Sequence, residues 1–204
     1  MTNLLSQRLK ADTNKYHVSL DQLPVLRGLM HEQPEPRAYE QVIQCFYHCF
    51  RAWQGVFAQA EREYSIPAFA KIELHLTALE AEVAQFNSPF EAACTPPLPQ
   101  LTTLEDYLGY SYVLSGSHLG ARVILKALQR SSLAANYRFD FYLSQSAWPL
   151  TVSTWPAWKA ELDSLNDAGE IHPRVVIAAA IRCFKDLTHW FQHASSRSSV
   201  IHYI

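Results

Sequence analysis

Apolar side chains recur at every third or fourth residue along most of this 204-residue chain, and this spacing constrains its fold most strongly. A repeat of 3.6 residues puts such side chains on one face of an α-helix, which must then be buried. No alternation with a period of two persists long enough to predict a strand. We therefore expect an all-α helical bundle of about seven helices. The clearest faces are Leu5, Leu9, Thr13, His17 and Leu20; Val42, Phe46, Phe50, Trp53 and Phe57; Ile72, Leu76, Leu79, Val83 and Phe86; and Val176, Ala180, Phe184, Leu187 and Phe191.

Proline and polar residues separate these faces and mark loops or helix starts. Pro156 and Pro173 fit the first turn of a helix, where a missing N–H is tolerated. Thr103 followed by Asp106 predicts a capped helix start near Leu104. No linker or internal repeat divides the chain, and its length suits one domain. We expect one helical domain over residues 1–194 and a loose tail over residues 195–204.

The composition argues against two classes of partner. Hydrophobic residues make up 49% of the chain and charged residues 18%, as in an ordinary folded domain. The longest purely apolar run covers residues 175–181, whereas a membrane span needs roughly 20 residues. The formal net charge of −2 leaves no broad basic surface for nucleic acid. We expect neither a membrane nor a nucleic-acid partner.

Three further features bear on location and cofactors. Arg8 and Lys10 interrupt the first helical pattern, so it lacks the apolar core of a secretory signal, and we expect a cytoplasmic protein. Four cysteines, two of them Cys45 and Cys49, do not form a dense disulfide framework, and we expect reduced thiols. No G-x-G-x-x-G fingerprint occurs, so we expect no tightly bound flavin or nicotinamide.

Gly116 and Gly120 interrupt the strong helical pattern of residues 104–128. Each costs on the order of 1 kcal/mol relative to alanine inside a helix. Their spacing of four places both on one face, where another group can approach the backbone closely. That group is either a second helix, crossing closely or at a kink, or a bound ligand.

His17 continues the stripe of Leu9 and Thr13, so we expect its ring to point inward. Together with the glycine pair, the residues of this helix suggest a haem pocket in which His17 is an axial imidazole. Asp21, one helical turn later, is placed to orient the second ring nitrogen. Lys10, two turns earlier, can reach a haem propionate while its stem covers the haem edge. The alternatives are a core histidine without a metal and a solvated lysine.

These segments resemble the haem oxygenase family. Residues 9–17, LKADTNKYH, are similar to its proximal helix. Residues 112–124, YVLSGSHLGARVI, resemble the distal helix of its bacterial branch. Residues 39–54 and 179–191 are similar to the second long helix and the last helix. The resemblance therefore spans most of the chain and implies the family's helical fold.

The resemblance implies a role for individual residues. His17 matches the proximal iron ligand, and Gly116 and Gly120 match the glycines that let the distal backbone approach the haem. Lys10 and Lys159 match cations that meet the propionates. The other expected pocket residues are Thr13 and Asp21 on the first helix, Tyr112 rather than Tyr110 near a propionate, Ser117 on the distal side, and Phe184 as an aromatic lining.

Two positions depart from parts of the family. Animal members carry aspartate where this chain has Ser117, and the serine is usual in the bacterial branch. Many bacterial members carry glutamate where this chain has Ser115. A short serine at 117 can hold water rather than act as a strong acid. Ser115 removes any contact that the glutamate makes.

The resemblance also implies a reaction and its partners. Haem is both substrate and cofactor, its iron ligated by His17, and O2 opens the ring at a meso carbon to give biliverdin, CO and ferrous iron. Electrons come from a separate donor protein, a ferredoxin or flavoprotein reductase. A biliverdin-accepting protein is a further candidate partner.

Other readings of the same residues are open. A non-enzymatic haem carrier or sensor could keep the same pocket and lack turnover. A di-iron bundle needs Glu-x-x-His pairs, and the chain has none. Cys45 and Cys49 share a helix face, but no second thiol pair completes a tetrahedral metal site. His118 lies two residues after Gly116, so we expect it to face away from the glycines, toward solvent or a neighbouring helix.

Overall fold

The computed structural model describes residues 4–65, 72–87, 92, 94–147 and 154–194. Within these residues the protein consists of α-helices and two short 3-10 turns, without strands, which confirms the predicted all-α class. These residues form eight α-helices, close to the predicted number of about seven. They are α1 (Leu5–Asp21), α2 (Pro24–Arg27), α3 (Pro36–Tyr64), α4 (Ile72–Val83), α5 (Leu104–Leu128), α6 (Asp140–Ala147), α7 (Thr154–Asp167) and α8 (Pro173–Ala194), with 3-10 turns at Gly28–Met30 and Ser132–Ala135. The tail predicted for residues 195–204 lies outside the described residues.

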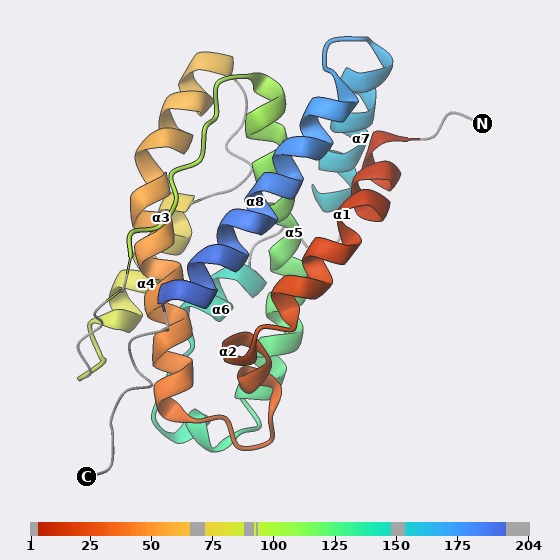
Figure 1. The fold of residues 1–204 in the computed structure, drawn as a ribbon. Helices are drawn as coiled ribbons and strands as arrows, with labels where there is room; N and C mark the ends of the chain where they lie inside the picture. Colours follow the sequence, from red (N-terminus) through yellow and green to blue (C-terminus); the bar gives the residue numbers. More distant parts are fainter. Residues whose placement is uncertain (1–3, 66–71, 88–91, 93, 148–153, 195–204) are drawn as a thin grey trace.

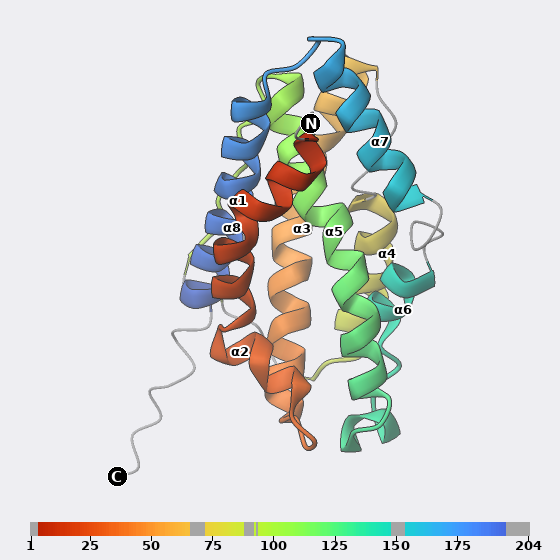
Figure 2. The ribbon, with the colours of Figure 1, turned by 90° about the vertical axis from the view of Figure 1, so that its right-hand side faces the viewer.

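The four long helices α1, α3, α5 and α8 form the body of the bundle. α8 crosses over α5 and lies between α3 and α1 (Figure 1). α4 packs on α3 and α6, and α7 packs beside the first half of α1. α1 and α5 run in the same direction, whereas α7 runs in the opposite direction (Figure 2). These directions decide which side chains face one another in the candidate site.

The predicted apolar faces bury as expected on α3 and α8. Trp53 and Phe57 on α3 and Phe184 and Phe191 on α8 are each at most 4% exposed. The face predicted to end at Phe86 is shorter, because α4 ends at Val83. Thr103 caps α5 as predicted, with its hydroxyl accepting a hydrogen bond from the Asp106 N–H at 3.2 Å. None of the described helices combines the length and apolarity that a membrane crossing requires.

Gly109 is where two helices cross closely. A Cβ added to Gly109 would lie 2.5 Å from Ala179 Cβ and 2.6 Å from the carbonyl oxygen of Val176. It would also lie 2.7 Å from the backbone nitrogen of Ala180. Backbone atoms cannot move aside cheaply, so the contact between α5 and α8 requires glycine here. The close crossing considered for Gly116 and Gly120 therefore occurs elsewhere on the same helix.

A buried histidine pair joins α4, α5 and α6. His75 Nε2 lies 2.8 Å from His118 Nε2, and each residue is 1% exposed. Ser144 donates its hydroxyl proton to the Phe141 carbonyl at 2.8 Å, so it accepts a hydrogen bond from His75 Nδ1 at 3.1 Å. His118 Nε2–H then donates to His75 Nε2. His118 thus packs against the neighbouring helix α4. A neighbouring helix is one of the two environments predicted for it, the other being solvent.

Candidate functional site

His17 lies on α1 with its ring held by Asp21. His17 Nδ1 is 2.9 Å from Asp21 Oδ2, one helical turn away, and both side chains are 58% exposed. Asp21 is the ring's one hydrogen-bond partner among the described residues, so Nε2 is available to a ligand. The hydrogen bond to Asp21 raises the pKa of His17, while partial burial opposes that rise. The arrangement fits an axial imidazole whose second nitrogen is oriented by a carboxylate.

The expectation that His17 points into the core is wrong. Leu5, Leu9 and Thr13 are buried, but a stripe with a spacing of four turns by about 40° per step around a helix of 3.6 residues per turn. By the third step, at His17, the stripe has left the core side. Tyr16 and Leu20 pack against the core there in its place, and the His17 ring is open to solvent.

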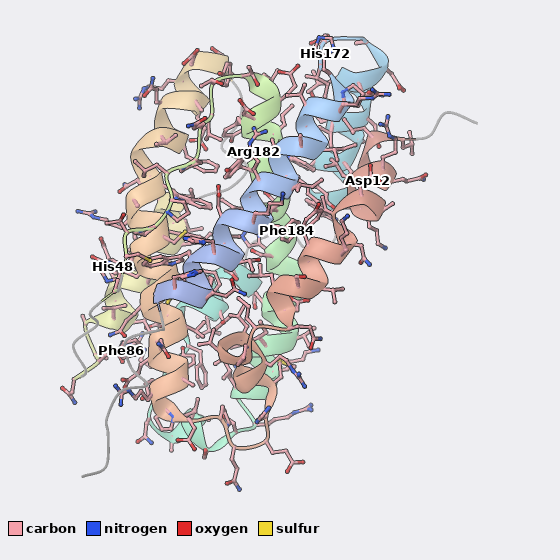
Figure 3. All side chains as sticks on the ribbon, in the orientation of Figure 1. Asp12, His48, Phe86, His172, Arg182 and Phe184 are labelled. Carbon is pink, nitrogen blue, oxygen red and sulfur yellow. The ribbon has the colours of Figure 1, made fainter. Side chains whose placement is uncertain are left out.

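Phe184 forms the wall beside the His17 ring. It is 4% exposed, and its ring lies edge-on to His17 at a centroid distance of 5.7 Å and an interplanar angle of 69°. Figure 3 shows Phe184 on α8, where that helix passes beside α1. A core aromatic therefore fixes one side of the imidazole, while Asp21 fixes its rotation.

Gly116 and Gly120 define what we call the glycine face of α5. Among the described residues, a Cβ added at Gly120 would meet no heavy atom within 4 Å. A Cβ at Gly116 would meet only the ring of Trp155, at 3.7 and 4.0 Å. Neither glycine is therefore required by a close helix contact with the described residues. The backbone at Gly120 is open to a ligand.

The glycine face and His17 lie at matching levels on two parallel helices. Burial raises the pKa of Tyr112, and a hydrogen bond with the Thr13 side chain partly opposes that rise, so α1 and α5 meet at these residues. His17 follows Thr13 by one turn, and Gly116 follows Tyr112 by one turn, each about 6 Å along its helix. Both helices run the same way and diverge beyond this contact (Figure 2). His17 and the glycine face therefore lie at matching levels on two diverging helices.

Exposed apolar side chains flank His17 and the glycine face. Val18 on α1 is 47% exposed, and Leu119 and Val123 on α5 are 42% and 58% exposed. Exposed apolar surface next to an orientated imidazole and a bare backbone suits a flat apolar ligand. Haem supplies such surface on both faces of its ring. The residues present therefore fit the group that the sequence predicts.

Lys10 and Lys159 lie on facing helices near one end of this region. Ser6 donates two hydrogen bonds to the Asp163 carboxylate, from its backbone N–H at 2.8 Å and its hydroxyl at 2.7 Å, which joins α1 to α7. Lys10 comes one turn after Ser6, and Lys159 one turn before Asp163. Because α1 and α7 are antiparallel, both lysines lie on the same side of that contact, toward His17 (Figure 2). No described carboxylate forms an ion pair with either lysine.

The two candidate tyrosines face different neighbours. Tyr110 is 2% exposed and donates a hydrogen bond to Asp186 Oδ2 on α8 at 2.5 Å. Tyr112 is half-buried and faces Thr13 and the tryptophans of α7. Only Tyr112 is therefore on the glycine side of α5. Ser117 is exposed, and its hydroxyl donates to the Leu114 carbonyl at 2.7 Å.

Sequence reasoning missed Trp155 and Trp158. Their rings stack at a centroid distance of 5.1 Å and an angle of 4°, and Tyr112 lies 5.6 and 6.0 Å from them. A spacing of three places both tryptophans on one face of α7, which is a signal the sequence does carry. The alternative metal site at Cys45 and Cys49 gains no support, since the described residues hold no cluster of three or more candidate ligands. Both cysteines are buried, and neither forms a disulfide bond with a described residue.

Comparisons with known proteins identify the family and support the fold. The family model described as Heme oxygenase matches residues 3–193. This chain therefore belongs to the haem oxygenase family, whose members degrade haem. A solved structure of the haem oxygenase of Neisseria meningitidis, in its NO-bound and CO-bound forms, is similar in fold, with a TM-score of 0.67. The sequences are 23% identical, and 96% of each chain is covered. No curated protein sequence matches.

Proposed function

We propose that this chain binds haem through His17 Nε2 and opens the ring at a meso carbon to biliverdin, releasing CO and ferrous iron. The reaction uses O2 and electrons from a separate donor protein. One observation carries the proposal: an imidazole held by Asp21 at 2.9 Å lies level with a glycine face whose backbone at Gly120 is open. Family membership supports haem as the substrate.

Each side of the site has its own task in this proposal. When bound, haem supplies both the iron that activates oxygen and the carbon that is oxidised. His17 would hold the haem iron through Nε2, and Asp21, bonded to Nδ1, would keep the ring oriented for that role. Gly120 would add no side chain against the bound group, which would leave room for oxygen beside the backbone. Ser117 is short and exposed and can hold water there.

The remaining residues seat the substrate. Lys10 and Lys159 bind the two propionates from α1 and α7, and Tyr112, with Thr13, approaches the same edge. Phe184 supports the proximal face beside His17. Each cation is exposed or half-buried, so each contact contributes modestly, on the order of 1 kcal/mol.

Electrons must enter from another protein, because the chain carries no dinucleotide fingerprint. A ferredoxin or a flavoprotein reductase is the proposed donor, and a biliverdin-accepting protein is a further proposed partner. The chain itself holds no flavin or nicotinamide in this proposal.

The second candidate function is a haem carrier or sensor without turnover, since the same pocket serves either role. The test is to add haem, a reductase system and O2 and to follow the Soret band. Decay of that band with the appearance of biliverdin supports the enzyme, and a stable Soret band supports the carrier.

The His17→Ala variant separates ligation from folding. His17 is 58% exposed, so the apo-variant is expected to melt as the wild type does, while losing the histidine-ligated haem spectrum and turnover. Added imidazole should restore part of the spectrum. An unchanged spectrum and full activity without imidazole would show that another residue is the ligand.

A further inference from the structure

Trp155 closes the glycine face of α5 at one end. In the part of the chain that the structure describes, its ring atoms Cη2 and Cζ2 are the only heavy atoms that a Cβ at Gly116 would meet, at 3.7 and 4.0 Å. One turn further on, a Cβ at Gly120 would meet nothing within 4 Å. The open stretch of backbone thus begins at Gly116, and the boundary there is one indole side chain from α7.

The contact at Gly116 is not close enough to need glycine. A separation of 3.7 Å is an ordinary van der Waals distance, so alanine would fit against Trp155. Compared with Gly109, where a Cβ would lie 2.5 Å from Ala179, the space between α5 and α7 is generous. Gly116 therefore leaves a space between the α5 backbone and the indole ring of Trp155. The packing of α5 against α7 does not fill this space.

The indole is held in position by aromatic neighbours. Trp155 stacks on Trp158, with planes 4° apart and centroids separated by 5.1 Å. Trp158 is 3% exposed and belongs to the core, and Tyr112 of α5 packs against both rings. Trp155 itself is half-buried, so one part of its surface is supported by the core and another part is accessible.

We propose that Trp155 is a specificity-determining residue for the tetrapyrrole, contacting the edge of the ring where the glycine face ends. The fixed indole ring of Trp155 limits how far the tetrapyrrole can enter along α5. It excludes binding positions in which the edge substituents of the tetrapyrrole would lie beyond Gly116. Trp155 thereby selects porphyrins by their edge groups and restricts haem to one orientation, which sets the meso carbon that is opened. This inference rests on the proposed haem site.

The test compares Trp155→Ala and Trp155→Phe, with Leu98→Ala as the control, because Leu98 is an apolar residue 62% exposed beside α3. The first measurement is the Kd of zinc protoporphyrin and of zinc deuteroporphyrin, which lacks the two vinyl groups. Neither probe requires turnover. The second measurement is the ratio of biliverdin isomers, and the third is the melting temperature of the apo-protein.

Trp155→Ala is expected to weaken zinc protoporphyrin binding roughly 3–10-fold, as the loss of one aromatic contact implies. Trp155→Ala should also reduce the preference between the two porphyrins and yield mixed biliverdin isomers. Trp155→Phe should retain most of the wild-type affinity, porphyrin preference and isomer ratio. Unchanged affinity, preference and isomers in Trp155→Ala would overturn the inference. So would a lower apo melting temperature with the porphyrin preference intact, which indicates packing alone.

Failure of the proposed reaction gives a different result. A wild-type protein that binds both porphyrins but forms no biliverdin contradicts the proposed reaction. The two Kd values still test the role of Trp155 in porphyrin binding. A wild-type protein that binds neither porphyrin contradicts the haem site and, with it, the role of Trp155.

Discussion

The Asp21 carboxylate lies 2.9 Å from His17 Nδ1, one helical turn further along α1. A carboxylate in this position fixes the ring orientation and increases the basicity of the ligand nitrogen. We expect Asp21→Asn to weaken haem binding by up to about tenfold. This is the low end of the losses found when a group that orients a metal-binding histidine is removed, because the His17–Asp21 pair is exposed. Absorption titration gives the affinity, and resonance Raman gives the iron–histidine stretching frequency.

Asp12→Asn is the control for Asp21, since Asp12 is also exposed on α1. Both variants lose one carboxylate from the same helix, so a general charge effect would appear in both. An Asp21→Asn protein with the wild-type affinity and stretching frequency would remove Asp21 from the site.

Gly120→Ala and Gly109→Ala form a matched pair on α5. At Gly120 the new methyl meets nothing within 4 Å, so helix propensity should stabilise the apo-protein by roughly 1 kcal/mol, while the methyl intrudes above the haem and lowers biliverdin yield. At Gly109 the methyl overlaps Ala179 and the α8 backbone, so overpacking should destabilise by roughly 1–3 kcal/mol. Apo thermal melts and biliverdin yield per haem measure both effects.

The two alanine variants should therefore move stability in opposite directions. An apo-protein clearly destabilised by Gly120→Ala, with normal biliverdin yield at a permissive temperature, would show that Gly120 serves packing rather than the ligand.

Lys10→Ala and Lys159→Ala test whether these two lysines bind the haem propionates. Each exposed or half-buried cation should contribute about 1 kcal/mol, so each variant should raise the haem Kd roughly fivefold. Loss of both lets the ring rotate, and the ratio of biliverdin isomers should change. High salt should reduce the difference from wild type because it screens exposed charges.

Arg51→Ala controls for net charge, since Arg51 lies on α3 and pairs with Glu80 at 3.6 Å. If the double lysine variant matches this control in both affinity and isomer ratio, neither lysine holds a propionate.

The His75 and His118 pair predicts a pH dependence of stability. Burial lowers the pKa of His75 to about 3, with repulsion from His118 adding to the effect, and burial lowers the pKa of His118 to about 4. Below about pH 6.5 the unfolded chain binds protons that the folded pair excludes. The free energy of unfolding therefore falls as the pH falls through this range, and the pair's contribution is fully present above it.

His118→Gln removes one titrating group from this pair. Between about pH 7.5 and pH 5.5, the variant should lose roughly 1 kcal/mol less stability than wild type, measured by urea unfolding. His31→Gln, at an exposed position, is the control. An unchanged pH dependence in His118→Gln would mean that the buried pair does not stay neutral in the folded protein.

The sequence alone determined the all-α class and the main buried faces. Trp53 and Phe57 on α3 and Phe184 and Phe191 on α8 repeat with the helical period, and a face of that kind has to be covered by another helix. The local signals at Thr103 and Asp106 also sufficed, because a helix cap involves only neighbouring residues.

Other predictions failed or were missing because they depend on where helices lie relative to one another. The His17 stripe drifts around α1, and only the packing of α1 against α8 shows where along the helix it leaves the core. Gly109 lies where α5 and α8 cross closely, yet as a single glycine it carries no sequence signal comparable with the spaced pair at Gly116 and Gly120. His75 and His118 are 43 positions apart and meet only after α4 and α5 pack together.

In the candidate site, too, some features follow from the sequence and others only from the tertiary structure. The spacing of His17 and Asp21 within one helix, and of Gly116 and Gly120 within another, follows from the geometry of a single α-helix. Tertiary structure alone decided that these two pairs lie at matching levels and that the Trp155 ring ends the glycine face. Side chains from separate helices share a site only through the directions and crossing points of those helices, and no local period encodes them.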